Sequence, residues 1–316
     1  MESLKTMVLE NTRSCNLRCN ICPTVYTRHY PAGFMDMETF HRILDHTSPE
    51  FFPKCALMGW GEPFLDTRYF EKLEYLKKTG YAVGSTTNAT LLTKDLVIRL
   101  QDAGLDLLNV SIDPFHIRAA KITLDELIKH LLSALGSTAR GQLSFTVGVT
   151  VALAKSDMNF LQILLEHLRK LPVSHIGVIP LIMIPSDGFF SELVRGEDMS
   201  RLKQATKERF PDLKVFFPYL DAPPSKNCRS DVFHNVYVTY NGDVVPCCTL
   251  AMEFPNFTFD GQRHRTSLLS FGSLKEMAFQ DIWTSSPYLA FRDSFRTGGI
   301  PSVCHCCNAW RKLPVR

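Results

Sequence analysis

The sequence has no long uninterrupted apolar run and no marked excess of either charge. Its longest apolar run, residues 176–184, includes a proline and is too short to cross a bilayer. The N-terminus lacks the basic segment and apolar core of an export signal. A net charge of +3 gives no reason to expect a nucleic-acid or membrane partner. We therefore expect a cytoplasmic protein, and 316 residues suffice for one large domain or two of moderate size.

Cysteine is nearly absent from the middle of the chain, where the long stretch between Cys22 and Cys228 contains only Cys55. Secreted proteins held by disulfides are short and spread their cysteines along the chain. In a large protein of a reducing compartment, grouped thiols more often bind metal. The groups here are Cys15, Cys19 and Cys22 near one end, and Cys228, Cys247, Cys248, Cys304, Cys306 and Cys307 near the other.

The first two-thirds of the sequence alternates β-rich runs with amphipathic helical patterns. Apolar residues recur at helical spacing after Thr93, an expected N-cap, and again over residues 124–135 and 160–168. For the last of these helices we expect an N-cap at Ser156 or Asp157. Such alternation predicts an α/β fold of parallel βα units. Six units fit, so we expect a partial (β/α)6 barrel resembling a TIM barrel, with its active site at the C-terminal strand ends. The expected strands cover residues 6–10, 55–58, 82–86, 107–112, 143–153 and 175–180.

The character of the sequence changes near residue 218. Pro218, Pro223 and Pro224 indicate a linker, and the dipeptide Asn241-Gly242 indicates a hairpin turn between two short strands. Two helical patterns, over residues 274–283 and 287–296, follow the hairpin. We therefore expect two domains, a catalytic βα domain over residues 1–217 and a small cysteine-rich module over residues 218–316.

The N-terminal cysteines follow directly after the first expected strand. Cys15, Cys19 and Cys22 have the spacing Cys-x3-Cys-x2-Cys. A compact loop with three thiolates can hold three irons of a 4Fe–4S cluster, whose usual complement is four cysteines. The remaining iron is open to a small molecule unless the protein supplies a fourth ligand. The alternative is a structural zinc ion closed by His29 or Cys55.

With Ile21 before its last cysteine, this motif resembles that of the radical S-adenosylmethionine (radical SAM) superfamily. The resemblance implies that the open iron binds the amino and carboxylate groups of the methionine moiety. It also implies that reduction of the cluster cleaves a C–S bond and releases a 5′-deoxyadenosyl radical, which abstracts hydrogen from a substrate. In such enzymes the cofactor carries the chemistry, and the protein supplies position and electronics.

Further segments resemble elements of the same family, in the expected order after successive strands. Residues 59–63 resemble the Gly-Gly-Glu-Pro element that contacts the methionine amino group, with Trp60 in place of the second glycine. A turn or a strand-end cap explains each short segment equally well by itself, and their order favours the functional interpretation. The residues that the resemblance assigns to cofactor binding are Ile21, Gly59, Gly61, Glu62, Pro63, Thr87, Asn88, Ser111, Asp113 and Ile179.

The C-terminal cysteines resemble the auxiliary-cluster module called SPASM, or its shorter form, twitch. The resemblance implies that one auxiliary 4Fe–4S cluster is fully ligated by four thiols, those of Cys228, Cys247, Cys304 and Cys307. Cys248 in place of Cys247, and Cys306 in place of Cys307, stay open as ligands. A zinc ribbon is the alternative for this set. Cys55 lies in an apolar strand, where we expect it to pack as a small hydrophobic residue.

A fully ligated second cluster has no iron open to S-adenosylmethionine, so its natural role is electron transfer. We therefore expect hydrogen abstraction from a C–H bond and net two-electron oxidation, with the auxiliary cluster as electron acceptor. An external one-electron donor such as flavodoxin or ferredoxin would reduce the first cluster. The module order resembles that of the twitch-bearing dehydrogenase of the butirosin pathway, which implies alcohol dehydrogenation of a small sugar or cyclitol-type metabolite.

The main alternative is ribosomal-peptide maturation by crosslinking, epimerisation or side-chain oxidation. The segment before Cys15 is too short for the N-terminal leader-binding domain that many such enzymes carry, which disfavours a peptide substrate. A redox-neutral radical rearrangement also stays open, whereas the cysteine spacing disfavours molybdenum-cofactor synthesis. The candidates for a general base, each equally well explained as a surface residue, are His116, Arg118 and Lys155.

Overall fold

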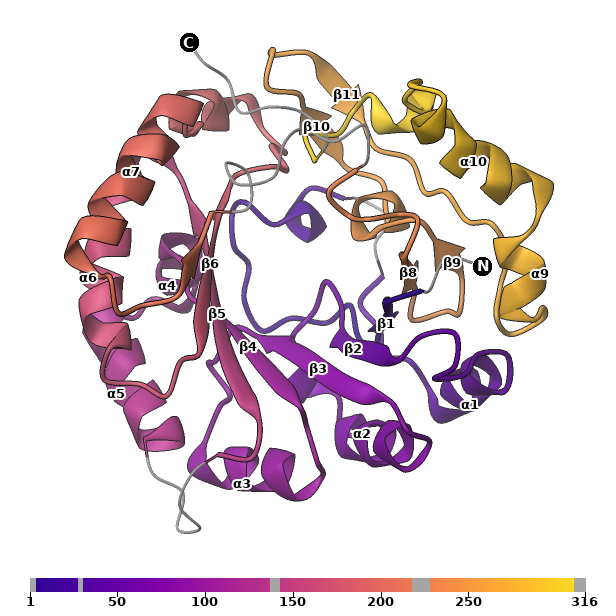
Figure 1. Cartoon of the computed structure of the whole chain (residues 1–316), viewed down its shortest axis with the longest axis horizontal. Coiled ribbons are helices and arrows are strands. Elements are labelled where there is room, and N and C mark those ends of the chain that lie inside the picture. The colour runs from indigo at the N-terminus through magenta and orange to yellow at the C-terminus, as the bar shows by residue number, and fades with distance from the viewer. Residues whose placement is uncertain (1–3, 28–30, 137–142, 218–227, 310–316) are drawn as a thin grey trace.

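The computed structural model describes residues 4–27, 31–136, 143–217 and 228–309, and Figure 1 shows their arrangement. The prolines of the predicted linker, Pro218, Pro223 and Pro224, lie outside the described residues, as does His29. A curved sheet with helices on its outer side forms most of the molecule. The helices are α1 (Met37–Asp45), α2 (Tyr69–Lys78), α3 (Lys94–Asp102), α4 (Pro114–Ala120), α5 (Leu124–Leu135), α6 (Met158–Leu168), α7 (Gly196–Arg209), α9 (Phe279–Trp283) and α10 (Ser286–Arg296).

The main sheet has nine strands in the order β7-β6-β5-β4-β3-β2-β1-β8-β9. Neighbours from β7 through to β8 are parallel, and only β8 and β9 pair antiparallel. The predicted partial barrel of six βα units is therefore confirmed, with one further strand, β7, beyond β6 and two, β8 and β9, beyond β1. The strands are β1 (Thr6–Glu10), β2 (Lys54–Met58), β3 (Ala82–Thr87), β4 (Leu107–Ser111), β5 (Thr146–Leu153), β6 (His175–Pro180), β7 (Val215–Phe216), β8 (Asn235–Val238) and β9 (Val244–Val245).

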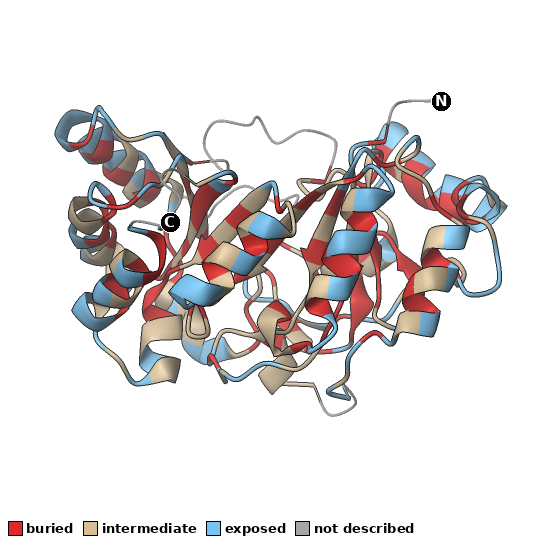
Figure 2. Ribbon diagram, turned by 90° about the horizontal axis from the view of Figure 1, so that it is seen from below, coloured by how far each residue is buried: buried red, intermediate tan, exposed pale blue. Residues whose placement is uncertain are grey.

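The helices cover the sheet with their apolar faces. Figure 2 shows buried residues on the side of each helix that faces the strands and exposed residues on the other side. The predicted cap of α3 is present, because the Thr93 hydroxyl accepts from the Leu96 amide at 3.1 Å. For α6, Asp157 occupies the N-cap position as predicted, but its side chain makes no capping hydrogen bond, and the Ser156 hydroxyl donates to Glu192. Cys55 is buried in the core on β2, as expected for a small hydrophobic residue.

Two predicted boundaries were wrong. The fifth strand begins at Thr146 rather than at residue 143, because its partner β4 begins only at Leu107, which pairs with Thr146. The helix expected over residues 274–283 begins at Phe279. The residues before Phe279 are bonded instead to the β8–β9 hairpin. Ser273 forms a β-bridge with Asp243, and the Leu274 amide donates to the Gly242 carbonyl.

The C-terminal segment is attached to the barrel at its open edge. β8 pairs with β1 from Thr6 opposite Asn235 to Leu9 opposite Val238, so the sheet itself continues into the module. The short helix α9 lies against the end of α1, where the Phe279 amide donates to the His46 carbonyl at 3.1 Å. Figure 1 shows α9 near β9 and α1, and α10 on the side of β11. The module also contains a small antiparallel pair, β10 (Pro255–Phe257) and β11 (Arg263–Arg265).

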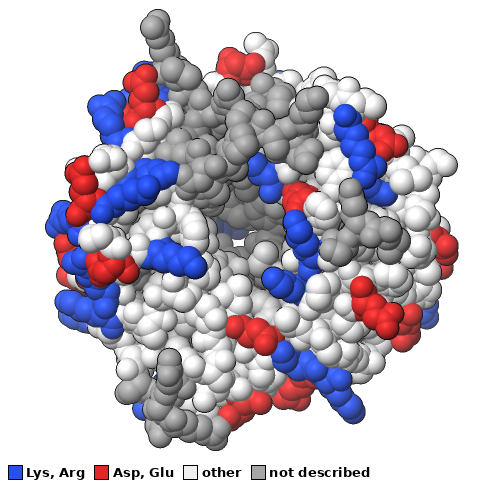
Figure 3. Space-filling view, viewed as in Figure 1, with Lys and Arg blue, Asp and Glu red and all other residues white. Residues whose placement is uncertain are grey.

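Charged side chains of both signs are interspersed over the face seen in Figure 3. This mixture agrees with the small net charge and gives that face no field of one sign. Among the described residues, no helix combines the length and apolar character needed to cross a membrane.

A buried ion pair fixes the chain just after residues 59–63. Lys72 of α2 is fully buried, and its ammonium donates to the Asp66 carboxylate at 2.6 Å and to the Met35 carbonyl. We expect Lys72→Met to lower the free energy of unfolding by about 3–5 kcal/mol, because it leaves Asp66 buried without its cation. Urea or thermal unfolding measures the loss.

The matched control for this prediction is Arg42→Met. Arg42 pairs with Glu38 at 3.1 Å on the exposed face of α1. An exposed pair contributes about 1 kcal/mol at most, so this control should unfold nearly as the parent does. Equal losses in the two variants would show that the burial of Lys72 is not what makes its pair important.

Candidate active site

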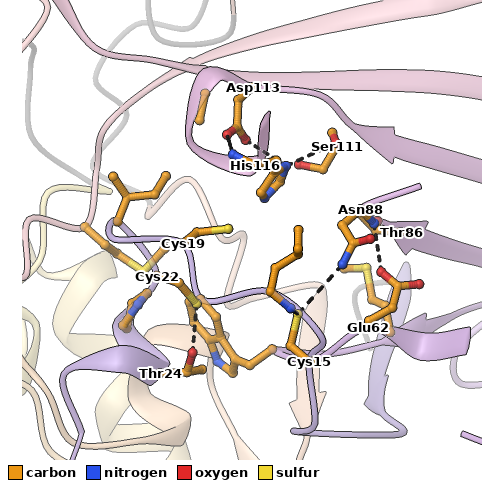
Figure 4. Close-up of a pocket in the computed structure, with 18 of the residues that line it drawn as sticks. Cys15, Cys19, Cys22, Thr24, Glu62, Thr86, Asn88, Ser111, Asp113 and His116 are labelled. Atoms are coloured by element: carbon orange, nitrogen blue, oxygen red, sulfur yellow. Dashed lines mark hydrogen bonds and ion pairs between the residues drawn. The ribbon is translucent and has the colours of Figure 1, made fainter. Parts of the chain in front are cut away.

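A cavity of about 340 Å³ opens at the carboxyl ends of the parallel strands. This edge is where ligands bind in sheets of this kind. Figure 4 shows the three thiols of the N-terminal triplet on one side of the cavity and polar residues from β3 and β4 on the other. Most of the predicted site residues line it: Cys15, Cys19, Ile21, Cys22, Gly59, Gly61, Glu62, Thr87, Asn88, Ser111, Asp113, His116 and Ile179. Pro63, Arg118 and Lys155 do not lie among its lining residues.

The three thiols lie on one loop between β1 and α1. Cys15 is exposed and accepts from the Leu17 amide at 3.4 Å, Cys19 is buried, and Cys22 lies 3.0 Å from the Thr24 hydroxyl. Burial, together with the negative charge of Asp113 and the neighbouring thiols, raises the pKa of Cys19 to about 12. Thiols in this state are neutral, so iron must displace their protons when a cluster is assembled.

The glycines of residues 59–63 let this segment approach the cysteine loop closely. A Cβ on Gly61 would lie 2.3 Å from the Ser14 carbonyl oxygen, and one on Gly59 would lie 2.6 Å from Glu10 Cγ. The Glu62 amide donates to the same Ser14 carbonyl at 2.8 Å. The segment is therefore tied to the residue that precedes Cys15, and both glycines are required by the close approach.

Glu62 is a buried carboxylate held at the wall of the cavity. It accepts from the Thr87 hydroxyl at 2.7 Å and from the Asn88 amide at 2.8 Å, both at the end of β3. Burial raises the pKa of Glu62, and these hydrogen bonds oppose the rise. The Asn88 side chain in turn donates to Cys15 Sγ at 3.8 Å. The carboxylate is thus fixed beside the cysteine loop, where a ligand's ammonium group can reach it.

Asp113 has a structural role in addition to its place in the cavity. Its carboxylate caps α4 by accepting from the Phe115 amide at 3.0 Å and the His116 amide at 2.9 Å. Burial raises the pKa of Asp113, whereas the nearby His116 lowers it. The His116 Nδ1 lies 3.1 Å from the Ser111 carbonyl oxygen and 3.2 Å from Asp113 Oδ2. Ser111, Asp113 and His116 therefore form one connected group at the end of β4.

The three candidates for a general base are placed differently. His116 lines the cavity. Arg118 points to the surface, where it pairs with Asp157 at 3.2 Å and packs over the Phe115 ring. Lys155 is exposed at the start of the 3-10 turn η3 (Lys155–Asp157). Only His116 of the three is therefore in position to reach a ligand in this cavity.

A second, smaller cavity lies in the C-terminal module. All four thiols expected to hold an auxiliary cluster line it: Cys228, Cys247, Cys304 and Cys307. Cys248 and Cys306 are not among its lining residues, and the Cys306 thiol donates to the Val303 carbonyl at 3.1 Å. Burial raises the pKa of Cys307 to about 12. The arrangement fits a cluster held by four thiols, with the two remaining thiols outside its cavity.

The zinc alternative for each thiol set requires its ligands to converge on one point. Structural zinc requires four ligands at about 2.0–2.3 Å from one point. Within the described ranges, no three His, Cys, Asp or Glu side chains converge closely enough to hold one metal ion. Cys55, an alternative zinc ligand for the triplet, is buried in the core and does not line the active-site cavity.

A buried network at the end of β1 involves residues that no sequence motif identifies. Glu10 is fully buried and accepts from Arg13 Nε at 3.0 Å, from the Tyr237 hydroxyl at 2.9 Å and from the Tyr240 amide at 3.1 Å. Arg13 also donates to the Ala251 carbonyl at 3.3 Å and packs over the Tyr240 ring. The network joins the C-terminal module to the segment that leads into Cys15.

Comparison with known families agrees with this geometry. Residues 9–136 match the Radical SAM superfamily, and residues 228–308 match SPASM, an iron–sulfur cluster-binding domain. Residues 9–136 therefore form a radical SAM domain, and residues 228–308 form a SPASM domain. The cofactors of the protein are S-adenosylmethionine and a 4Fe–4S cluster, and the SPASM domain binds auxiliary iron–sulfur.

Among individual relatives, a tungsten-containing aldehyde ferredoxin oxidoreductase cofactor-modifying protein from Pyrococcus furiosus is 29% identical over 318 residues. That alignment covers 96% of this chain and 87% of the relative. An AdoMet-dependent heme synthase from Methanosarcina barkeri is 36% identical over 104 residues, which cover 33% of this chain and 30% of the relative.

Solved structures share the fold at low sequence identity. Streptococcus suis SuiB bound to S-adenosylmethionine has a TM-score of 0.70 and 16% identity, over 98% of this chain and 72% of SuiB. BtrN in complex with AdoMet and 2-DOIA has a TM-score of 0.55 and 16% identity, over 98% of this chain and 95% of BtrN. SuiB has also been solved with its precursor peptide SuiA. The shared fold thus accommodates both peptide and small-molecule ligands.

Proposed function

We propose that this protein is a radical SAM oxidoreductase that removes two electrons from a small-molecule substrate, with one auxiliary 4Fe–4S cluster as electron acceptor. The single observation that carries the proposal is the second cavity, which four cysteine thiols line. A cluster with four protein thiolates has no open iron, so it can exchange electrons but cannot bind S-adenosylmethionine in the same way. An external one-electron donor such as flavodoxin or ferredoxin reduces the first cluster.

The residues of the main cavity position the reactants. Cys15, Cys19 and Cys22 hold the first cluster, and the fixed carboxylate of Glu62 accepts from the ammonium group of the cofactor. When bound, S-adenosylmethionine supplies the hydrogen-abstracting chemistry. The remaining assignments place Ser111 and Asp113 at the ribose or carboxylate, Ile21 and Ile179 at apolar contacts to the adenine, and the main-chain groups of Gly59, Gly61, Pro63, Thr87 and Asn88 around the methionine moiety.

The substrate reaction balances as a dehydrogenation. The substrate loses a hydrogen atom from carbon, then a proton, and then one electron, which leaves a new C=O double bond if the carbon bears a hydroxyl group. His116 is the proton acceptor, because it is the one basic candidate that lines the cavity. Cys228, Cys247, Cys304 and Cys307 would hold the auxiliary cluster that could accept this electron. Sugar and cyclitol-type alcohols fit this reaction.

The Glu62 assignment predicts a defect in cofactor binding. We expect Glu62→Gln to weaken S-adenosylmethionine binding roughly 10- to 100-fold, because a hydrogen bond to a charged group contributes about 1.5–3 kcal/mol. Calorimetry with the cluster-loaded protein measures the affinity. Glu71→Gln is the control, since Glu71 pairs with Arg68 on the exposed surface of α2. Unchanged affinity in Glu62→Gln would remove Glu62 from the binding site.

The oxidative reaction is tested by removing two thiols from the second cavity. In Cys304→Ala/Cys307→Ala, we expect 5′-deoxyadenosine formation to persist while oxidised product falls much further, because the substrate electron has lost its acceptor. The assay is anaerobic turnover with a panel of sugars and aminocyclitols deuterated at the carbinol carbon. Deuterium should enter 5′-deoxyadenosine in parent and variant alike.

The matched control is Cys306→Ala, since the Cys306 thiol bonds to a backbone carbonyl outside the cavity. This control should retain the ratio of product to 5′-deoxyadenosine. If product and 5′-deoxyadenosine fall together in the double variant while its fold and first cluster survive, the module is structural or binds substrate. The reaction would then be a redox-neutral rearrangement or peptide maturation.

A second candidate function is modification of the cofactor of a tungsten-containing enzyme. It is favoured by the similarity to the Pyrococcus furiosus cofactor-modifying protein, which extends over 96% of this chain. The test is the mass of the cofactor extracted from an aldehyde ferredoxin oxidoreductase produced with and without this protein. A mass difference that disappears with the Cys15→Ala variant supports this function, and identical masses reject it.

A further inference from the structure

Trp60 connects the main cavity to the C-terminal module. It lies between Gly59 and Gly61, and it lines the main cavity together with the cysteine loop. On its other side it packs against the module, in a cluster with Tyr237 and Val245 of the β8–β9 hairpin, and also with Val8, Ala251 and Cys248. The only hydrogen-bond donor of an indole is its N–H group. The Trp60 Nε1 donates to the Cys248 carbonyl at 3.1 Å, across 188 positions of sequence.

The hydrogen bond of Trp60 ends next to a proposed cluster ligand. Cys247 lines the second cavity, and Cys248 follows it directly at the start of the 3-10 turn η5 (Cys248–Ala251). The Cys247 carbonyl accepts from the Leu250 amide at 3.2 Å, which holds this turn in place. A short stretch of backbone therefore connects the indole hydrogen bond to the Cys247 thiol. Of the residues that line the two cavities, none lines both.

We propose that Trp60 is the medium through which electrons pass between the main cavity and the auxiliary cluster. The inference rests on the proposed function and adds the path to it. One electron would leave the substrate radical after its proton has gone and cross the indole and the Cys248–Cys247 backbone. It would arrive at the four thiols that would hold the auxiliary cluster as acceptor. Trp60 itself gains and loses no electron in the net reaction. The same path returns the electron from the auxiliary cluster to the first cluster.

Trp60 is distinguished from the other link between the module and the barrel. The Glu10–Arg13 network also crosses this boundary, but neither residue lines the main cavity. The Glu10–Arg13 network positions the barrel and the module relative to each other. Trp60 differs because its indole ring lines the main cavity and also packs against the module. An aromatic ring has a delocalised electron system, and an aliphatic side chain does not. Replacing Trp60 by an apolar aliphatic residue therefore removes the proposed electron path and retains an apolar contact with the module.

The experiment needs no substrate. Protein with both clusters is fully reduced, freed of reductant by gel filtration and mixed with excess S-adenosylmethionine. The first cleavage uses the electron already at the Cys15, Cys19 and Cys22 site, and a second cleavage requires the electron stored at the auxiliary cluster. Rapid quenching measures 5′-deoxyadenosine in two phases, and freeze-quenched electron paramagnetic resonance follows oxidation of the auxiliary cluster.

The measured quantity is the ratio of the second rate constant to the first within each protein, so that any change in cofactor binding cancels. We expect Trp60→Leu to lower this ratio several-fold and Trp60→Phe, which keeps a ring, to lower it less. Oxidation of the auxiliary cluster should slow in step with the second phase. Trp283→Phe is the matched control, because Trp283 packs under Arg292 and lines neither cavity. Its ratio should equal that of the parent.

An unchanged ratio in Trp60→Leu that retains the iron of both clusters overturns the proposal, since it shows that Trp60 only packs. If Trp60→Leu does not retain its iron, the same measurement is made on Trp60→Phe, and an unchanged ratio of the two rate constants in that variant overturns the proposal. A parent protein with a first phase but no second phase also overturns it. Absence of the first phase in the parent has a different meaning, because it rejects the proposed function itself.

Discussion

Replacing Cys15, Cys19 and Cys22 by alanine should abolish reductive cleavage of S-adenosylmethionine. The three thiols line the same side of the main cavity and are its only cysteines among the described lining residues. Without them no iron remains there to bind the cofactor. We expect the variant to keep about four of about eight irons, because the auxiliary cluster is held by other thiols. Iron analysis and 5′-deoxyadenosine assay of anaerobically prepared protein measure both effects.

The control for this experiment is Cys55→Ala. Cys55 is the same residue type, but it is buried in β2 and lines neither cavity. The control should keep both clusters and the cleavage activity. Loss of all iron from the triple variant would mean that the two sites do not assemble independently, and retained cleavage would contradict the assignment of the triplet.

Glu10→Ala should have the second large effect, on stability. We expect it to lower the free energy of unfolding by about 3–5 kcal/mol, because Arg13 loses its buried carboxylate partner. The bonds from Tyr237 and Tyr240 are lost as well, so the module should also loosen from the barrel. Thermal unfolding of the anaerobic protein measures the first effect, and limited proteolysis between the two parts measures the second.

Glu10→Gln is the informative companion, because it retains the side-chain shape and part of the hydrogen bonding while removing the charge. Its loss should lie between those of the parent and Glu10→Ala. If Glu10→Ala unfolds like the parent, the network does not hold the module to the segment before Cys15, and the role assigned to it is wrong.

The local parts of this protein were predictable from the sequence. The six strands of the barrel, the Thr93 cap and the Asn241-Gly242 hairpin turn depend on patterns within a few residues of one another. The cysteine triplet could be recognised for the same reason, since its three thiols lie within a single loop. The family resemblance that these local motifs carry therefore identified most of the residues that line one cavity.

Contacts between distant segments were not predictable. Nothing in the residues around Trp60 indicates that its indole meets the Cys248 carbonyl, and nothing near Glu10 indicates that Tyr237 bonds to it. The pairing of β8 with β1 likewise depends on which edge of the barrel is open. Residues close together in the chain can also face different ways: Arg118 lies only two residues after His116, but it pairs with Asp157 at the surface.

The residues directly after β6 could have been identified as site residues from the topology alone. Leu181, Ile182 and Met183 line the main cavity, although they belong to no motif. They follow a parallel strand at its carboxyl end, where the other site residues also lie. In a fold of this class that position alone is a signal, and it identifies these three side chains as candidates for contact with a substrate.

The most direct test of the whole account is electron paramagnetic resonance of the reduced protein before and after addition of S-adenosylmethionine. The account requires one cluster with an open iron at the triplet and one cluster closed by four thiols. We therefore predict two 4Fe–4S signals, of which only the one absent from the triple cysteine variant changes on addition of the cofactor. Stoichiometric zinc without iron, or a spectrum that the cofactor leaves wholly unchanged, would contradict it.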